Sequence, residues 1–225
     1  MTDRIRDYIE GRAGDYDDLA RDIWENPERS GEEERSAALH RVRLAASGFR
    51  IMDHPEMPHA FAAERGAGKP VIALMGEYDA LPGLSQACSV RREPRVPGGP
   101  GHGCGHNLLG VGSLAAAEAL ADAFEAAGLP GTVRYYGCPA EEALGRIPQV
   151  KAGRFDDADA ALTWHPADVN TPHRYTTSAN VSLIVRFSGR ASHAAMAPHA
   201  GRSALDGAQI FNLGLEFLRE HLEKG

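Results

Sequence analysis

Apolar residues follow two different periods along the chain, and the changes between them predict the order of helices and strands. From Ile5 to Trp24 they recur at helical spacing, until ENPERSGEEE ends the helix with a proline and a glycine. Further helices are predicted for RSAALHRVRLAASGF and LLGVGSLAAAEALADAFEAAGLPG. Short apolar runs predict four strands: AFAAER, VIALMGEY, GTVRYYGC and ADAALTW. Strands that alternate with helices predict an α/β fold.

The pattern changes at HPADVNTPHRYTTSAN, which is polar and rich in turn residues. Beyond it, VSLIVRFSG alternates like a half-buried strand, and SALDGAQIFNLGLEFLREHLEKG has helical spacing. One strand and one helix are too few to bury a core of their own. We therefore expect a main domain over residues 1–177 and the start of a second domain over residues 178–225.

Composition narrows the class of partner. The 225 residues are 43% hydrophobic, which is enough for a globular core, and the formal net charge is -7 with no basic run. This charge argues against nucleic acid or a membrane surface and favours a small-molecule partner. The charged start MTDRIRDYIEGRAGDYDD lacks an apolar signal core, so a cytoplasmic location is expected. Three cysteines favour thiols used in chemistry or packing over a disulfide framework.

The loop GHGCGHN places Cys104 and His106 two positions apart, between glycines that free the backbone. Such a turn can direct a thiol and an imidazole at one cation. An Asn-capped helix is predicted directly behind it, and a helix start favours the thiolate form that binds metal. Two ligands do not complete a four-ligand shell, and a flexible loop with an incidental His and Cys gives the same pattern. Further ligands must come from elsewhere.

Candidate ligands follow two predicted strands, at the edge where open α/β sheets place their sites. Glu141 and Glu142 come after GTVRYYGC, and His165 ends ADAALTW before a proline. One of two adjacent carboxylates can ligate a metal while its neighbour faces a substrate as a general base. An acidic first helical turn explains the glutamates without a metal, and a lone strand-end histidine is more often structural. Taken together with Cys104 and His106, these motifs favour a metal site.

Two further motifs carry residues whose roles the local sequence leaves open. Glu77 and Asp79 follow the strand VIALMGEY, and Asp79 either orients a ligating imidazole or forms a turn before ALPG. His193 lies in GRASHAAMAPHAG, beyond the predicted boundary. A role in polarising a substrate competes there with that of a plain exposed histidine.

Five motifs in order, GEYDALPGL, GHGCGHNLLG, GCPAEE, ALTWHP and SHAAMAPHAGRSALD, resemble the amidohydrolase branch of the aminoacylase/carboxypeptidase-type dinuclear metallopeptidase family. The resemblance covers nearly the whole chain and is closest to the p-aminobenzoyl-glutamate hydrolase-like subgroup. It implies a zinc-peptidase-like catalytic core with a mixed sheet and flanking helices, then the start of an α+β lid domain that mediates dimerisation. Members continue well past this length to a last histidine ligand, so the chain resembles the amino-terminal half of such an enzyme.

The resemblance also implies site residues. It matches the ligands of two divalent metal ions, Zn2+ or Mn2+, to Cys104, His106, Glu142 and His165. Glu141 matches the general base that takes a proton from the attacking water and delivers it to the leaving amine. His193 matches a lid histidine that contacts substrate, often from the partner subunit. Asn107 stands where many relatives have Asp, which leaves Asp79 as the candidate outer carboxylate.

We therefore expect a metal-dependent amidohydrolase that cleaves the amide bond of N-acyl or N-aroyl amino acids or dipeptides and forms a homodimer. One alternative is hydrolysis of another C–N bond, in a carbamoyl group or an aromatic amine. Another is a catalytically incompetent fragment that binds metal or a partner. The missing last ligand favours this fragment, whereas Glu141 and four matched ligands favour the enzyme.

Overall fold

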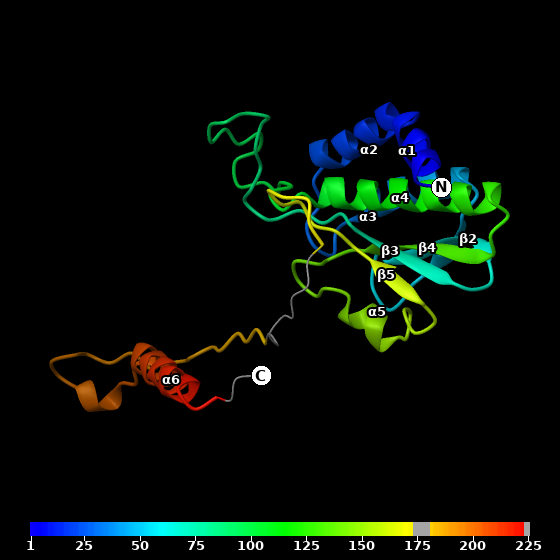
Figure 1. Ribbon diagram of the computed structural model, residues 1–225. Coiled ribbons are helices and arrows are strands. Elements are labelled where there is room, and N and C mark those ends of the chain that lie inside the picture. The colour runs from blue at the N-terminus through cyan, green and yellow to red at the C-terminus, as the bar shows by residue number, and fades with distance from the viewer. Residues whose placement is uncertain (173–180, 223–225) are drawn as a thin grey trace. The chain divides into compact units, whose positions relative to one another are not determined.

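The computed structural model describes residues 1–172 and 181–222, in two units of residues 1–169 and 170–225 (Figure 1). The expected boundary between residues 177 and 178 lies outside the described residues. None of the described helices is both long and apolar enough to cross a membrane.

The first unit is built on a five-stranded sheet in the order β1-β2-β4-β3-β5. Its strands are β1 (Arg50–Asp53), β2 (Phe61–Ala67), β3 (Val71–Glu77), β4 (Gly131–Cys138) and β5 (Ala160–Leu162). β3 runs parallel to β4 and β5, whereas β2 pairs antiparallel with β4 and with β1. The sheet is therefore mixed, as expected. The central strands β3 and β4 are almost continuously apolar because both of their faces are covered.

Helices cover one face of this sheet, and Figure 1 shows α4 lying directly on it beneath α1 and α2. These elements are α1 (Thr2–Glu10), α2 (Ala13–Glu25), α3 (Glu34–Ala46) and α4 (His106–Ala126). The short α5 (Ile147–Lys151) lies on the other side. The main core forms between α4 and the sheet, where Leu114, Phe61 and Tyr135 are fully buried.

One buried carboxylate ties three helices together. Glu118 of α4 is fully buried and accepts hydrogen bonds from Tyr16 Oη at 2.6 Å and Ser47 Oγ at 2.6 Å. It also pairs with Arg43 Nε at 3.0 Å. A buried charge is stable only when it is paired and hydrogen-bonded, and these contacts meet that condition.

The structure departs from the sequence prediction at several elements. The helix expected from Ile5 to Trp24 is two helices, because the chain breaks at Gly11 and Arg12. The strand expected over ADAALTW is confined to Ala160–Leu162, and neither β1 nor α5 was expected. Elements of three to five residues contain too few apolar positions to establish a period.

The second unit contains the 3-10 turn η1 (Pro198–Ala200) and the helix α6 (Ala204–Arg219). Ser203 caps α6, since its Oγ accepts a hydrogen bond from Asp206 N at 3.1 Å. The strand expected over residues 181–189 was wrong: these residues are exposed and have no ladder partner among the described residues. The nearest pairing is one isolated bridge between Arg190 and Arg202. An alternating sequence forms a strand only when a neighbouring strand pairs with it.

Candidate metal centre

The candidate site lies at the carboxyl edge shared by the three parallel strands. Asp79 follows β3, the Glu141–Glu142 pair follows β4, and His165 follows β5. α4 begins at the same site with His106, directly after the glycine-rich loop. Gly105 has a left-handed φ of 80°, and a Cβ there would lie 2.8 Å from Pro166 Cγ. The loop therefore packs closely against the segment that carries His165 only because this position is glycine.

Two groups of side chains converge on His106. The ligand atoms of Cys104, His106 and His165 all lie within 4.8 Å of one another, and so do those of Glu77, His106 and Glu141. Cys104 Sγ is 3.3 Å from His165 Nε2, and the two imidazole rings meet edge to face at 5.8 Å. The sequence prediction that these motifs share one edge is thus realised in space, over residues that are 61 positions apart.

Asp79 fixes the orientation of His106. The imidazole is fully buried, and its Nδ1 is 2.8 Å from Asp79 Oδ1. The second carboxylate oxygen of Asp79 accepts hydrogen bonds from Ser30 Oγ at 2.7 Å and Glu142 N at 3.1 Å. Burial alone would raise the pKa of Asp79, but these hydrogen bonds outweigh it and lower the pKa. An ionised Asp79 therefore accepts a hydrogen bond from the Nδ1–H of His106 and turns Nε2 toward the cluster.

The free lone pair of His106 is what a cation would use. Nε2 is buried and has no hydrogen-bond partner, although Glu77 Oε2 lies 3.3 Å away. Burial alone would lower the pKa of His106, yet Asp79 and the nearby carboxylates raise it. An unpartnered nitrogen beside a thiol, a second imidazole and carboxylates is a donor set that fits a divalent transition-metal ion.

The adjacent glutamates lie equally close to this nitrogen. Glu141 Oε2 and Glu142 Oε1 are each 3.9 Å from His106 Nε2. Their side chains differ in exposure, at 37% for Glu141 and 26% for Glu142. The distances do not separate a ligand from a general base, so the division of roles between them stays a prediction.

Two expectations about the glycine-rich loop were wrong. Burial, with a hydrogen bond and negative charge from Glu142, raises the pKa of Cys104 to about 12, so the helix start does not favour the thiolate. Burial and the nearby carboxylates both disfavour the thiolate here, and a bound cation would oppose the effect of the carboxylates. Asn107 does not cap α4 either: the helix begins at His106, and Asn107 Nδ2 donates to Ala20 O at 3.2 Å.

Sequence reasoning missed three residues that support the site. Ser30 and Glu33 come from the segment between α2 and α3, which the sequence indicated only as a helix break. Arg146 forms an ion pair with Glu77. Burial raises the pKa of Glu77 against the opposing charge of Arg146, and burial also raises the pKa of Glu33 to about 7. No local pattern marks these residues, because their partners are distant in the sequence.

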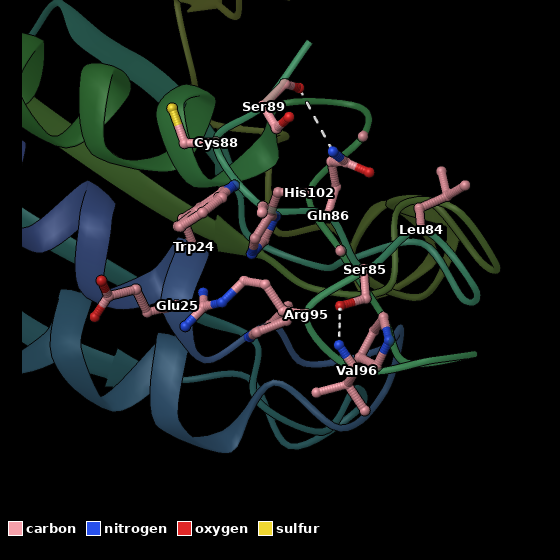
Figure 2. Close-up of a pocket in the computed structure, with 15 residues that line it drawn as sticks. Trp24, Glu25, Leu84, Ser85, Gln86, Cys88, Ser89, Arg95, Val96 and His102 are labelled. Carbon is pink, nitrogen blue, oxygen red and sulfur yellow. Dashed lines mark hydrogen bonds between the residues drawn. The ribbon is translucent and has the colours of Figure 1, made fainter. Parts of the chain in front are cut away.

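A cavity of about 730 Å³ opens beside the loop that precedes Cys104 (Figure 2). Its wall includes Trp24 of α2, Arg95, and His102 with Gly103. Figure 2 shows Arg95 extending toward Trp24, and its guanidinium lies 5.0 Å from the indole ring centroid. No carboxylate among the described residues forms an ion pair with Arg95. The cavity thus offers an aromatic face, a positive charge at Arg95 and a negative charge at Glu25.

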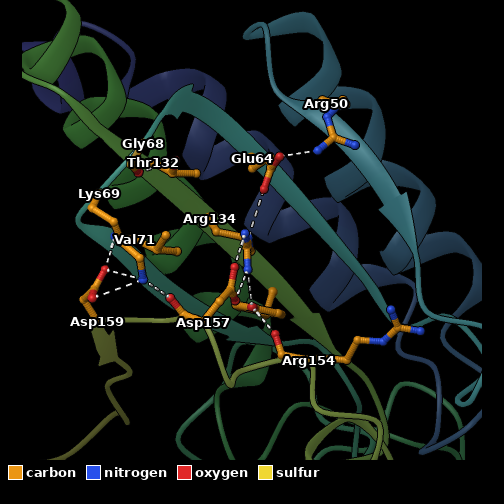
Figure 3. Close-up of polar contacts among 11 residues, drawn as sticks. Arg50, Glu64, Gly68, Lys69, Val71, Thr132, Arg134, Arg154, Asp157 and Asp159 are labelled. Carbon is orange, nitrogen blue, oxygen red and sulfur yellow. Dashed lines mark hydrogen bonds and ion pairs between the residues drawn. The ribbon is translucent and has the colours of Figure 1, made fainter.

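Polar contacts at the opposite end of the sheet hold the segment that leads into β5 (Figure 3). Arg134 of β4 pairs with Asp157 at 2.7 Å and with Glu64 of β2 at 3.0 Å. Asp159 accepts a hydrogen bond from Val71 N at 2.7 Å and pairs with Lys69 at 3.0 Å. These contacts set the register of β5 against β3, and β5 in turn determines where His165 lies.

His193 belongs to the second unit, which is described on its own. Its Nδ1 accepts hydrogen bonds from Met196 N at 3.1 Å and Ala195 N at 3.3 Å, and the side chain is exposed. The ring therefore closes a local turn. Its expected contact with a substrate stays a prediction.

The mixed sheet under α4 and the Cys/His/carboxylate cluster at its edge define a class, that of metallohydrolase-like α/β proteins. The model of peptidase family M20/M25/M40 matches residues 73–206, and the chain belongs to that family.

Relatives agree with this assignment. The chain is 48% identical to a subunit of the p-aminobenzoyl-glutamate hydrolase of Escherichia coli K12, over 97% of this chain and 46% of that protein. It is 33% identical to the Xaa-Arg dipeptidase of Mus musculus, over 91% of this chain and 47% of that protein. The chain thus spans about half the length of these curated relatives.

Solved structures share the fold. A dinuclear metal-binding peptidase of the M20 family from Bacillus subtilis matches with a TM-score of 0.58 and 29% identity, over 68% of this chain and 42% of that one. An aminohydrolase-like protein from methicillin-resistant Staphylococcus aureus matches with a TM-score of 0.71 over 99% of this chain and 59% of that one, and its 18% identity shows the fold alone. With the cluster around His106, the first of these matches supports divalent metal binding.

Proposed function

We propose that this chain carries the metal-dependent site of an amidohydrolase that cleaves the amide bond of N-acyl or N-aroyl amino acids or dipeptides. The observation that carries the proposal is the buried His106, whose unpartnered Nε2 faces a thiol, an imidazole and carboxylates. Two relatives are named as a p-aminobenzoyl-glutamate hydrolase and an Xaa-Arg dipeptidase. The substrates in these names contain an amide bond, which supports the substrate class.

Four side chains would hold two divalent ions, Zn2+ or Mn2+: Cys104, His106, Glu142 and His165. When bound, such ions polarise a carbonyl group and make water a stronger acid. Asp79 contributes by keeping the Nδ1 proton of His106 in place, which leaves Nε2 free as a ligand. Glu77 is close enough to take part in the same cluster, since its carboxylate lies 3.3 Å from Nε2.

Glu141 would act as the general base. Its carboxylate takes a proton from water as the water oxygen attacks the amide carbon, and then delivers that proton to the leaving nitrogen as the C–N bond breaks. The position of Glu141 as the first glutamate of GCPAEE supports this division of roles, because it matches the general base that the family resemblance implies.

The cavity beside Cys104 supports an aryl-bearing substrate. Trp24 offers a ring face for stacking, and Arg95 offers a guanidinium for a carboxylate. His102 and Gly103 line the cavity and directly precede Cys104 in the sequence, so the wall of the cavity continues into the loop that carries this ligand. An N-aroyl amino acid offers a partner to both Trp24 and Arg95, the aryl ring of its acyl portion to the indole and the carboxylate of its amino-acid portion to the guanidinium.

The remaining expectations concern assembly. We propose that residues beyond about 178 begin a lid that pairs two copies of the chain and brings His193 to a substrate. The Escherichia coli relative is named as one subunit of its hydrolase, which supports association with a further chain. A cytoplasmic location also remains part of the proposal.

Metal analysis of the purified chain, combined with a hydrolysis screen, tests this function. The screen contains p-aminobenzoyl-glutamate, β-alanyl dipeptides and acyl amino acids. We expect bound divalent metal, metal-dependent release of amine, and loss of both in Cys104→Ser. Cys88→Ser is the matched control, because Cys88 is an exposed free thiol outside the cluster. Bound metal without hydrolysis would favour a metal-binding chain without catalysis, and absence of metal would contradict the proposal.

A further inference from the structure

Glu33 is a buried carboxylate with one short contact to the site. It lies between α2 and α3 and is fully buried. Its Oε1 accepts a hydrogen bond from Ala140 N at 2.6 Å, across 107 positions of sequence. Its Oε2 has no hydrogen-bond partner. Burying a carboxyl group with an unsatisfied oxygen costs free energy, so its retention in the core requires an explanation.

The partner of Glu33 has an unusual backbone conformation. Ala140 has a φ of 54°, in the left-handed region, and it is not a glycine. This conformation is unfavourable for a residue with a Cβ and persists only where the surroundings enforce it. Ala140 directly precedes Glu141 and Glu142, so its conformation decides the direction in which both side chains leave β4.

The turn that follows closes back onto Ala140. Ala140 O accepts hydrogen bonds from Leu144 N at 2.8 Å and from Ala143 N and Gly145 N at 3.1 Å each. Within the turn, Glu142 N donates to Asp79 Oδ2 at 3.1 Å. Two buried carboxylates therefore hold the backbone on either side of Glu141: Glu33 binds the amide of Ala140, and Asp79 binds the amide of Glu142.

We propose that Glu33 is a positioning residue that holds Ala140 in its left-handed conformation and thereby aims Glu141 and Glu142 at the cluster around His106. The inference rests on the proposed function, because aiming the two glutamates matters only if they act at a metal site. The hydrogen bond from Ala140 to Glu33 and the left-handed conformation of Ala140 do not depend on that function. It assigns a role to a residue from the helical layer, far in sequence from every motif of the site.

Substitutions at Glu33 separate the hydrogen bond from the charge. Glu33→Gln keeps an acceptor oxygen at the same reach and removes the charge. Glu33→Met has similar length and no strong acceptor, and Glu33→Asp keeps the charge but withdraws the acceptor by one methylene. If Glu33 acts by positioning, the Glu33→Gln chain should match the parent chain in hydrogen exchange and metal affinity. The Glu33→Met and Glu33→Asp chains should be impaired in both. Glu118→Gln is the control for weakening a buried carboxylate elsewhere.

The first measurement is hydrogen exchange of the segment 138–145 in the metal-free chain, which depends on neither metal nor turnover. We expect Glu33→Met and Glu33→Asp to lose protection there by about tenfold or more, since the amide of Ala140 loses its acceptor. Glu33→Gln and Glu118→Gln should keep it. Should Glu33→Met fail to fold, Glu33→Asp provides the same comparison.

The second measurement is Co2+ affinity, followed by the absorption of the bound ion. We expect a loss of about tenfold or more for Glu33→Met and Glu33→Asp, the usual scale for a residue that orients ligands, and parent-like affinity for Glu33→Gln. Unchanged exchange in both Met and Asp variants overturns the proposal, as does a Gln variant as impaired as Met. A parent chain that binds no Co2+ contradicts the proposed function instead, and the exchange data then decide the role of Glu33.

Discussion

A single carboxylate, Asp79, contacts three parts of the site. One oxygen faces His106 Nδ1, and the other accepts from Ser30 and from the backbone of Glu142. The residue therefore sets a histidine tautomer and a loop position at the same time. Burial keeps these contacts away from competing water, which makes each of them stronger.

Replacement of this carboxylate gives a prediction at the residue scale. In Asp79→Asn, an amide oxygen can still face His106, but the amide NH2 then meets the donors of Ser30 and Glu142. We expect metal affinity to fall by about 10- to 100-fold. Competition with a chelator measures it, and Asp53→Asn serves as the control, because Asp53 lies on the edge strand β1 and pairs with Arg41. Equal affinity in the Asp79 variant would show that His106 needs no carboxylate to orient it.

A second prediction separates the adjacent glutamates. Glu141→Gln should keep metal content within about twofold while turnover falls by about a hundredfold or more, the usual effect of a lost general base. Glu142→Gln should lose metal. Metal content and hydrolysis rates of both variants, measured side by side, decide the matter, and the opposite pattern would mean that the two roles are exchanged.

The sequence was informative about residues that do chemistry and silent about residues that hold them. Cys104, His106 and His165 come together as their motifs predicted, because a Cys-Gly-His loop before a helix and a histidine after a strand carry metal-ligand side chains that the local sequence displays. Ser30 and Glu33 were missed, since a serine and a glutamate at a helix break have an ordinary local explanation. Their partners become evident only when the chain is folded.

At the scale of elements, the packing of α4 on β3 determines how His106 reaches the site. A Cβ at Gly110 would lie 2.5 Å from Glu77 O and 2.9 Å from His40 Nε2. The helix backbone therefore approaches the end of β3 more closely than any side chain allows. Glu77, which ends β3, and His106, which begins α4, come within reach of each other as a result.

Gly110→Ala tests this packing. Alanine favours a helix by about 1 kcal/mol over glycine, but here its methyl group would collide with backbone, and overpacking costs about 1–3 kcal/mol. We expect a net decrease in the free energy of unfolding, measured by urea denaturation, and weaker metal binding. Gly14→Ala in α2 is the control, because its Cβ would meet nothing within 4 Å. A stabilised Gly110→Ala chain would show that α4 can move outward at no cost.

Elements were predictable in proportion to their length and burial. β3 and β4 are mostly buried over seven and eight residues, and α4 is 21 residues long with 13 of them buried, so their ranges were close to the prediction. Residues 181–189 have a strand-like alternation, yet they form none among the described residues because no partner pairs with them. The spacing of apolar residues predicts which secondary structure a segment is able to form. Whether it forms a strand depends on pairing with another strand in the folded chain.

At the scale of the whole molecule, one buried histidine couples stability to pH. His40 is fully buried against Tyr78 and Tyr135, with Nδ1 donating to Ser36 O at 2.8 Å, and burial lowers its pKa to about 4. Its unfolded pKa is about 6.5. Between these values the unfolded chain binds a proton that the folded chain does not, so stability falls as pH decreases.

This coupling predicts that lowering the pH from 7.5 to 5 decreases the free energy of unfolding by about 2 kcal/mol through His40 alone. His40→Phe keeps an aromatic ring and removes the titration, so its unfolding free energy should depend less on pH by that amount. Urea denaturation of both chains at the two pH values measures the difference. Parallel pH profiles would show that the pKa of His40 is the same in the native and unfolded states.

The parallel pairing that builds the site also governs how quickly it can form. Val71 of β3 pairs with Thr132 of β4, and Leu74 pairs with Leu162 of β5, so the central strand joins partners that are far along the chain. Closing such long loops costs entropy before any contact repays it, and chains with distant contacts fold slowly. The cluster and its supporting contacts combine residues that are as far apart in the sequence as Ser30 and His165. During synthesis, therefore, the cluster around His106 can assemble only after β5 and His165 have left the ribosome.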